Sequence, residues 1–192
     1  MIESLDSNIS LHSLIWLFLA AFMLHDFEEI IRIEPWYRKH YRTILGRVPE
    51  KLRKDISSFA RMTSSQFAVA VCLEFIVFVP FTFLAAERES YLFFLGFNAV
   101  LLIHVFMHVG QALYVRMLVP GAVTAVLITL PYSVYLFYRL LHDNAVELSD
   151  IWFSLPFGLL LVPVILLGHK AGEKLVPAPV PANTQPPDHA GK

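Results

Sequence analysis

One apolar segment that ends in a group of ionisable side chains constrains the fold of this chain most. The run Leu14–Leu24 has no charged or polar aliphatic side chain, and it leads directly into His25, Asp26, Glu28 and Glu29. On a helix, residues three and four apart share a face, so His25 and both glutamates project together, whereas Asp26 points elsewhere. Ionisable groups at the deep end of a segment that belongs in lipid are costly, which makes them functional candidates.

The remainder of the chain predicts an all-α membrane protein. Its 56% hydrophobic content exceeds that of ordinary soluble domains. A spanning helix needs roughly 20 apolar residues, and the sequence offers five such segments, at about 11–31, 65–86, 91–113, 122–141 and 151–168. We therefore expect a polytopic membrane helix bundle with about five transmembrane helices in a single domain, residues 1–174, and a disordered, proline-rich tail, residues 175–192.

Positive charge is distributed unevenly along the chain. Nine of the fifteen Lys and Arg residues lie in Arg32–Arg61, a stretch interrupted by Pro35 and Pro49, which predicts a basic loop with room for short interfacial helices. Five spans with the N-terminus outside place thirteen cations on one side and two on the other. The positive-inside rule then predicts an outside N-terminus and a cytoplasmic C-terminus in a multi-pass protein of the cell membrane. Membrane lipids are the expected partners of the basic stretch, and nucleic acid is not.

Two histidines on the third predicted span match the first cluster in depth. His104 and His108 are four residues apart on one helix face, and counting from the outer end of each span places them level with His25 and Glu29. Imidazole nitrogens and carboxylate oxygens are ligands for divalent metals such as Zn and Fe. With further carboxylates from the first and second spans, the sequence predicts six candidate ligands for one or two ions: His25, Glu28, Glu29, Glu74, His104 and His108.

Such a ligand set favours a membrane metalloenzyme. A bound zinc or iron ion activates water or oxygen, and either Glu28 or Glu29, where it is not a ligand, serves as general base. Zinc implies a hydrolase and iron an oxidase, acting on a lipid-like or small hydrophobic substrate that enters from the bilayer. The alternative is a proton- or cation-coupled transporter that uses the same side chains as a relay.

A structural interpretation competes with these functions. Glu28, Glu29 and Arg32 can form an ion-paired end of the first span, and the two histidines of the third span can serve as interhelical hydrogen-bonding groups. Glu74 fits a buried protonated carboxyl as well as a ligand. In that case the chain is a non-catalytic membrane protein whose polar cluster only holds helices together.

The motif at residues 25–29 differs from a known helical zinc motif and resembles that of a protein family. Residues 25–29 read His-Asp-Phe-Glu-Glu, with Glu29 where the zincin motif H-E-x-x-H has its second histidine. Over about Leu11–Gly121 the chain resembles the HXXEE-domain family of small bacterial and archaeal multi-span proteins. That family has a further histidine, matched here by His104 or His108, and a Tyr-x-Pro-Gly element, which reads Leu-Val-Pro-Gly at 118–121. The resemblance implies a membrane protein and no particular reaction.

Overall fold

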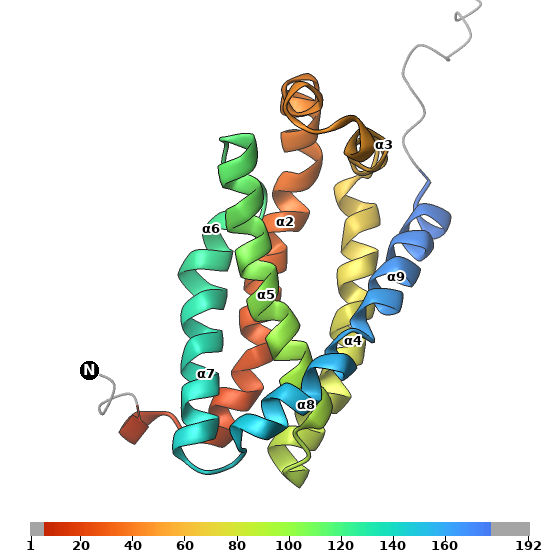
Figure 1. Ribbon diagram of the computed structural model, residues 1–192. Coiled ribbons are helices and arrows are strands. Elements are labelled where there is room, and N and C mark those ends of the chain that lie inside the picture. The colour runs from red at the N-terminus through yellow and green to blue at the C-terminus, as the bar shows by residue number, and fades with distance from the viewer. Residues whose placement is uncertain (1–5, 178–192) are drawn as a thin grey trace, which may run out of the picture.

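The chain folds as a bundle of helices. The computed structural model describes residues 6–177, which contain no strand. Most helices run roughly along one axis, and α3 lies across one end (Figure 1). The elements are α2 (Leu11–Arg47), α3 (Glu50–Phe59), α4 (Ser64–Arg88), α5 (Leu92–Val115), α6 (Ala122–Thr124), the π-helix η1 (Ala125–Thr129), α7 (Leu130–His142), α8 (Leu148–Gly158) and α9 (Leu161–Leu175).

Four segments within the described residues are long and apolar enough to cross a membrane: Ser64–Arg88, Leu92–Val115, Ala122–His142 and Leu148–Leu175. They correspond to the second through fifth predicted spans. The first predicted span lies in α2, which is not among the four. The all-α membrane character is thus supported, whereas the count of five spans and the orientation of the termini stay predictions. The predicted tail begins at the last residue of α9, and residues 178–192 lie outside the described residues.

The prediction of a basic loop with short interfacial helices at Arg32–Arg61 is wrong in the extent of the helices, because most of this stretch is helical. Helix α2 continues through Pro35 as far as Arg47, and α3 follows after a two-residue break. A proline inside a helix removes one backbone hydrogen bond and crowds the preceding turn. Two salt bridges between residues four apart favour the helix here, each with a 2.6 Å contact: Glu28–Arg32 precedes the proline, and Glu34–Arg38 spans it.

Contacts with the end of α5 also hold the extension of α2 in place. The indole Nε1 of Trp36 donates a hydrogen bond to the carbonyl oxygen of Leu118 at 2.7 Å. The Arg47 guanidinium donates to the carbonyl oxygen of Val115. Val115 is the last residue of α5, where helix carbonyls lack intrahelical partners, and Leu118 lies three residues beyond it. Sequence periodicity alone does not reveal such long-range partners, which explains why the helix was missed.

An aromatic core joins α2, α4 and α5. Phe78 of α4 lies edge-on to Phe18 and Phe22 of α2, with ring centroids 4.9 and 4.7 Å apart. Phe18 also contacts Phe94 of α5 at 5.5 Å. Edge-to-face pairs of this kind contribute roughly 0.5–1.5 kcal/mol each beyond the burial of their area. This core fixes α2 relative to α5, the two helices that carry the ionisable cluster.

The last predicted span is broken into two helices. Helix α8 crosses α5 where both have glycine: a Cβ added at Gly96 would lie 2.6 Å from the carbonyl oxygen of Ser154 and 2.7 Å from the backbone nitrogen of Gly158. The chain ends α8 at Gly158 and resumes as α9, which packs along α4 (Figure 1). Pro163 stands in the first turn of α9, where a missing N–H removes no intrahelical hydrogen bond.

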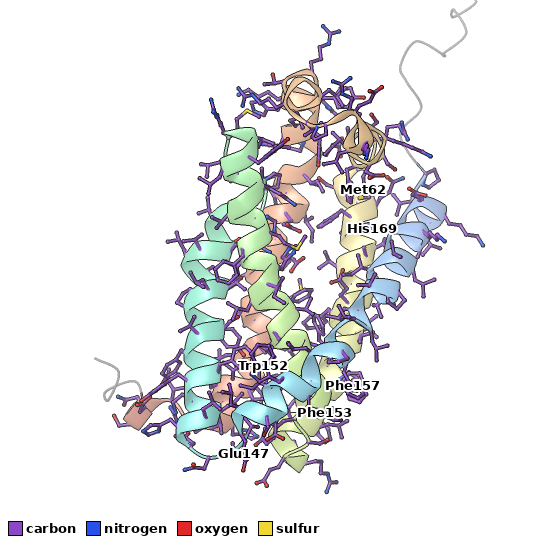
Figure 2. The ribbon with its side chains drawn as sticks, viewed as in Figure 1. Met62, Glu147, Trp152, Phe153, Phe157 and His169 are labelled. Atoms are coloured by element: carbon purple, nitrogen blue, oxygen red, sulfur yellow. The ribbon has the colours of Figure 1, made fainter. Side chains whose placement is uncertain are left out.

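Aromatic and charged side chains mark the end of the bundle where α7 meets α8. Trp152 and Phe153 of α8 are each 66% exposed, and they lie toward the same end as Glu147 (Figure 2). Aromatic residues are enriched at membrane–water interfaces. Nearby, Arg139 donates two hydrogen bonds to Asp143. These hydrogen bonds, together with the one from His142, hold the pKa of the Asp143 carboxyl below its usual value.

Candidate functional site

Ionisable side chains from α2 and α5 converge in the interior of the bundle. His25, Glu29, His104 and His108 each offer one ligand atom, and these atoms all lie within 4.8 Å of one another. His108 Nε2 is 2.9 Å from Glu29 Oε1 and 2.8 Å from His104 Nε2. The His25 ring stands edge-on to both other rings, at centroid distances of 5.0 and 5.4 Å. The two segments that the sequence places at equal depth therefore meet in the fold.

The cluster is buried except at one member. The side chains of His108 and Glu29 are 6% and 12% exposed and His25 as a whole residue is 1% exposed, whereas the His104 side chain is 39% exposed. Both α5 histidines lie on the same helix face, one turn apart. Access to the cluster from the surface is therefore expected on the His104 side.

The spacing of these atoms suits a metal ion. Ligand atoms about 2.0–2.1 Å from a tetrahedral ion lie about 3.3 Å from one another. The contacts measured here, 2.8 Å, 2.9 Å and 3.9 Å between His104 Nε2 and Glu29 Oε1, bracket that value. In addition, His25 Nε2 is buried and has no hydrogen-bond partner among the described residues. A buried polar atom of this kind calls for a partner, and a metal ion would supply one.

Glu28 has different surroundings from its neighbour Glu29. Its Oε1 accepts a hydrogen bond from Arg32 at 2.6 Å. Its Oε2 accepts two hydrogen bonds from Thr124, one from the backbone N–H at 2.8 Å and one from the hydroxyl at 2.7 Å. The structure thus places Glu28 in an ion-paired, hydrogen-bonded position outside the four-residue group. The structural interpretation fits Glu28, and the ligand interpretation fits Glu29.

Two further acids lie close to the cluster. Glu74, another of the six predicted ligands, is not one of the four converging residues, but it interacts electrostatically with Glu29. Asp26 interacts electrostatically with both Glu29 and Glu74; it is 6% exposed, and its Oδ2 has no hydrogen-bond partner in the part of the chain described. Asp26 lies off the helix face that His25 shares with Glu28 and Glu29, so the spacing pattern does not select it. A different criterion selects Asp26 from the sequence: it is an ionisable residue at membrane depth.

The turn before α6 closes over the cluster. Gly121 has φ +80°, and a Cβ there would lie 2.7 Å from both Glu29 Oε1 and His108 Cε1. Two constraints therefore require glycine at this position: the left-handed backbone conformation and the lack of space for a side chain. The turn also delivers Thr124, whose hydroxyl lies 3.1 Å from His25 Nδ1. Sequence reasoning missed Thr124, since a threonine in an apolar span has no distinguishing pattern beyond its place three residues after the Pro-Gly turn.

The fold and the site define a class of protein: a helical, membrane-type bundle with a His/Glu cluster in its interior. Within this class, the chain belongs to the family described as "Protein of unknown function with HXXEE motif", which matches residues 16–136. The chain is also 24% identical over 164 residues to the uncharacterized protein YrkK of Bacillus subtilis (strain 168), an alignment that covers 83% of this chain and 96% of that protein. No solved structure matches the chain. The resemblance drawn from residues 25–29 is thus confirmed.

Replacing Gly121 with alanine should destabilise the protein. A side chain there meets Glu29 and His108, and the left-handed backbone costs a non-glycine residue roughly 1–2 kcal/mol. We expect a lower midpoint of thermal unfolding in detergent, followed by tryptophan fluorescence. Gly46→Ala is the matched control, because a Cβ at Gly46 has nothing within 4 Å, and it should leave the midpoint unchanged or slightly raised. Equal midpoints for the two variants would contradict this account of the turn.

Proposed function

We propose that this protein is a membrane metalloenzyme in which His25, Glu29, His104 and His108 hold one divalent metal ion. The observation that carries the proposal is the convergence of their four ligand atoms within 4.8 Å inside an apolar helix bundle. Burying polar and ionisable groups without partners is costly. A shared cation is the simplest partner that satisfies all four at once.

The ligand set suits either zinc or iron. A bound zinc ion would supply activated water for hydrolysis, and a bound iron ion would supply oxygen chemistry. Glu29 is the carboxylate that belongs to the cluster. Glu28 is engaged by Arg32 and Thr124, so it fits a supporting role better than that of a free general base.

The surface around His104 supports a hydrophobic or lipid-like substrate. His104 is the most exposed member of the cluster, and Ile103, Phe106 and Met107 lie beside it in sequence along α5 with exposures of 52%, 62% and 52%. Exposed apolar side chains on a helix of spanning length are suited to contact lipid tails. A substrate dissolved in the bilayer would approach the cluster along this part of α5.

A proton- or cation-coupled transporter is the second candidate function. The observation that favours it is a pair of further acids, Asp26 and Glu74: Asp26 is 6% exposed, and its Oδ2 has no hydrogen-bond partner among the described residues. These acids extend the ionisable groups from α2 to α4, as a relay across a membrane requires. A relay of this kind needs no resident metal, so metal content separates the two functions.

The proposed topology has five passes in the cell membrane, with the first half of α2 as the first pass. The outer end of α2 then lies outside and α3 lies in the cytoplasm. The basic residues of Arg32–Arg61 support this orientation through the positive-inside rule. The cationic side of the bundle would face the anionic lipid headgroups of the inner leaflet.

Purified protein should retain metal. Inductively coupled plasma mass spectrometry on detergent-purified wild type should give about one Zn or Fe per chain. His25→Ala and His108→Ala should lose most of it, because each removes a ligand of a four-residue set. His142→Ala is the matched control: this histidine lies at the end of α7, with its side chain 59% exposed, outside the cluster.

Two outcomes would count against the metalloenzyme. Wild type that is metal-free and takes up no added Zn or Fe would favour the relay or a purely structural cluster. Equal metal content in all variants would show that the metal binds elsewhere. Thermal unfolding of each variant distinguishes a lost ligand from a lost fold.

The orientation can be tested with single cysteines. In a Cys72→Ser background, Lys54→Cys on α3 and Ser90→Cys between α4 and α5 should lie on opposite sides of the membrane. A membrane-impermeant maleimide should label residue 90 in intact cells and residue 54 only in inverted vesicles. The reverse pattern would overturn the proposed orientation, and labelling of both from one side would overturn the five-pass topology.

A further inference from the structure

Thr124 connects Glu28 to His25 through a single hydroxyl group. Its Oγ1 lies 2.7 Å from Glu28 Oε2 and 3.1 Å from His25 Nδ1. Its backbone N–H also donates to Glu28 Oε2, at 2.8 Å. The opposite nitrogen of the His25 ring, Nε2, is buried and has no hydrogen-bond partner among the described residues. One residue outside the ligand group thus contacts both the motif glutamate and the motif histidine.

The proton of the Thr124 hydroxyl has one favoured acceptor. A threonine hydroxyl has a single proton and can donate one hydrogen bond. Every other candidate acceptor lies farther away than Glu28 Oε2: His25 Nδ1 at 3.1 Å, and the carbonyl oxygens of Gly121 and His25 at 3.2 and 3.5 Å. A carboxylate is also a stronger acceptor than a carbonyl. The hydroxyl proton therefore points to Glu28.

The direction of that hydrogen bond decides the state of the His25 ring. With its proton on the Glu28 side, Thr124 Oγ1 presents only lone pairs to His25, so Nδ1 must carry the ring proton to complete the contact. In a neutral imidazole the other nitrogen then has a free lone pair. That nitrogen is Nε2, in the ring that faces His104 and His108.

We propose that Thr124 and Glu28 are positioning residues that fix His25 in the tautomer with the proton on Nδ1 and keep Nε2 available as a metal ligand. The inference rests on the proposed metal site, and it explains why Glu28 is held outside the ligand group. Histidine ligands commonly donate their second N–H to a carboxylate or another acceptor, which fixes both tautomer and ring orientation. Here a threonine stands between the histidine and the carboxylate.

The tautomer can be read directly in protein without metal. Nitrogen-15 labelled histidine gives different long-range proton–nitrogen correlations for the two tautomers, and the His25 signal is identified by its absence in His25→Ala. At about pH 8, where an imidazole is neutral, chelator-treated wild type should show His25 protonated at Nδ1. Thr124→Val should lose this preference and Thr124→Ser should keep it, because serine restores the hydroxyl. Thr129→Val is the control: it removes a buried hydroxyl that has no partner among the described residues.

Metal affinity provides the second readout. Titration with Co²⁺, followed by its visible absorption, should show about tenfold or greater weakening in Thr124→Val and little change in Thr124→Ser or Thr129→Val. The valine variant keeps the backbone hydrogen bond from residue 124 to Glu28, so the turn before α6 should survive. A thermal unfolding midpoint close to that of wild type would verify this.

The outcomes separate the two proposals. His25 protonated at Nε2 in the wild type, or an unchanged tautomer in Thr124→Val, would overturn the inference whether or not metal binds. Nδ1 protonation with no Co²⁺ binding would overturn the metal site and keep the tautomer assignment. Equal loss of affinity in Thr124→Val and Thr129→Val would show a general packing effect, and the positioning role would then be rejected.

Discussion

The contact between Glu29 and His108 is the interaction on which the rest of the site depends. It joins α2 to α5 at 2.9 Å in the interior of an apolar bundle. A carboxylate buried there is tolerated only when it is paired or bound to a cation. Two features of the surrounding structure allow this pairing: the aromatic core fixes the two helices, and Gly121 leaves room above the pair. In addition, His25 and His104 complete a set of four ligand atoms that could bind a cation.

The two adjacent glutamates of the motif have different tasks because they point to different neighbours. Glu29 faces the histidines, whereas Glu28 faces the first turn after Gly121 and the guanidinium of Arg32. Each glutamate therefore serves a different helix contact: Glu29 links α2 to α5, and Glu28 links α2 to α6. Glu29 lies next to Gly121 of the Pro-Gly turn, and Glu28 accepts a hydrogen bond from Thr124, which follows the turn. The motif and the turn, about 90 residues apart in the chain, therefore form one structural unit.

Sequence reasoning recovered the parts of this unit that depend on local pattern. Apolar length located the four candidate spans, and helix periodicity with depth counting brought His25 and Glu29 together with His104 and His108. It failed where long-range partners decide. Trp36 and Arg47 extend α2 by contacting carbonyl groups near the end of α5, and Thr124 enters the site through a turn. No periodicity in the sequence encodes these contacts, because each depends on how distant segments pack.

The central claim is that the four converging residues bind a metal, and X-ray absorption at the metal edge tests it most directly. Protein loaded with one equivalent of Zn²⁺ should give a first shell of nitrogen and oxygen at about 2.0–2.2 Å. The multiple-scattering pattern should match three imidazole rings, from His25, His104 and His108. A shell of oxygen alone, or a spectrum without imidazole scattering, would contradict the account and leave the cluster with a structural or relay role.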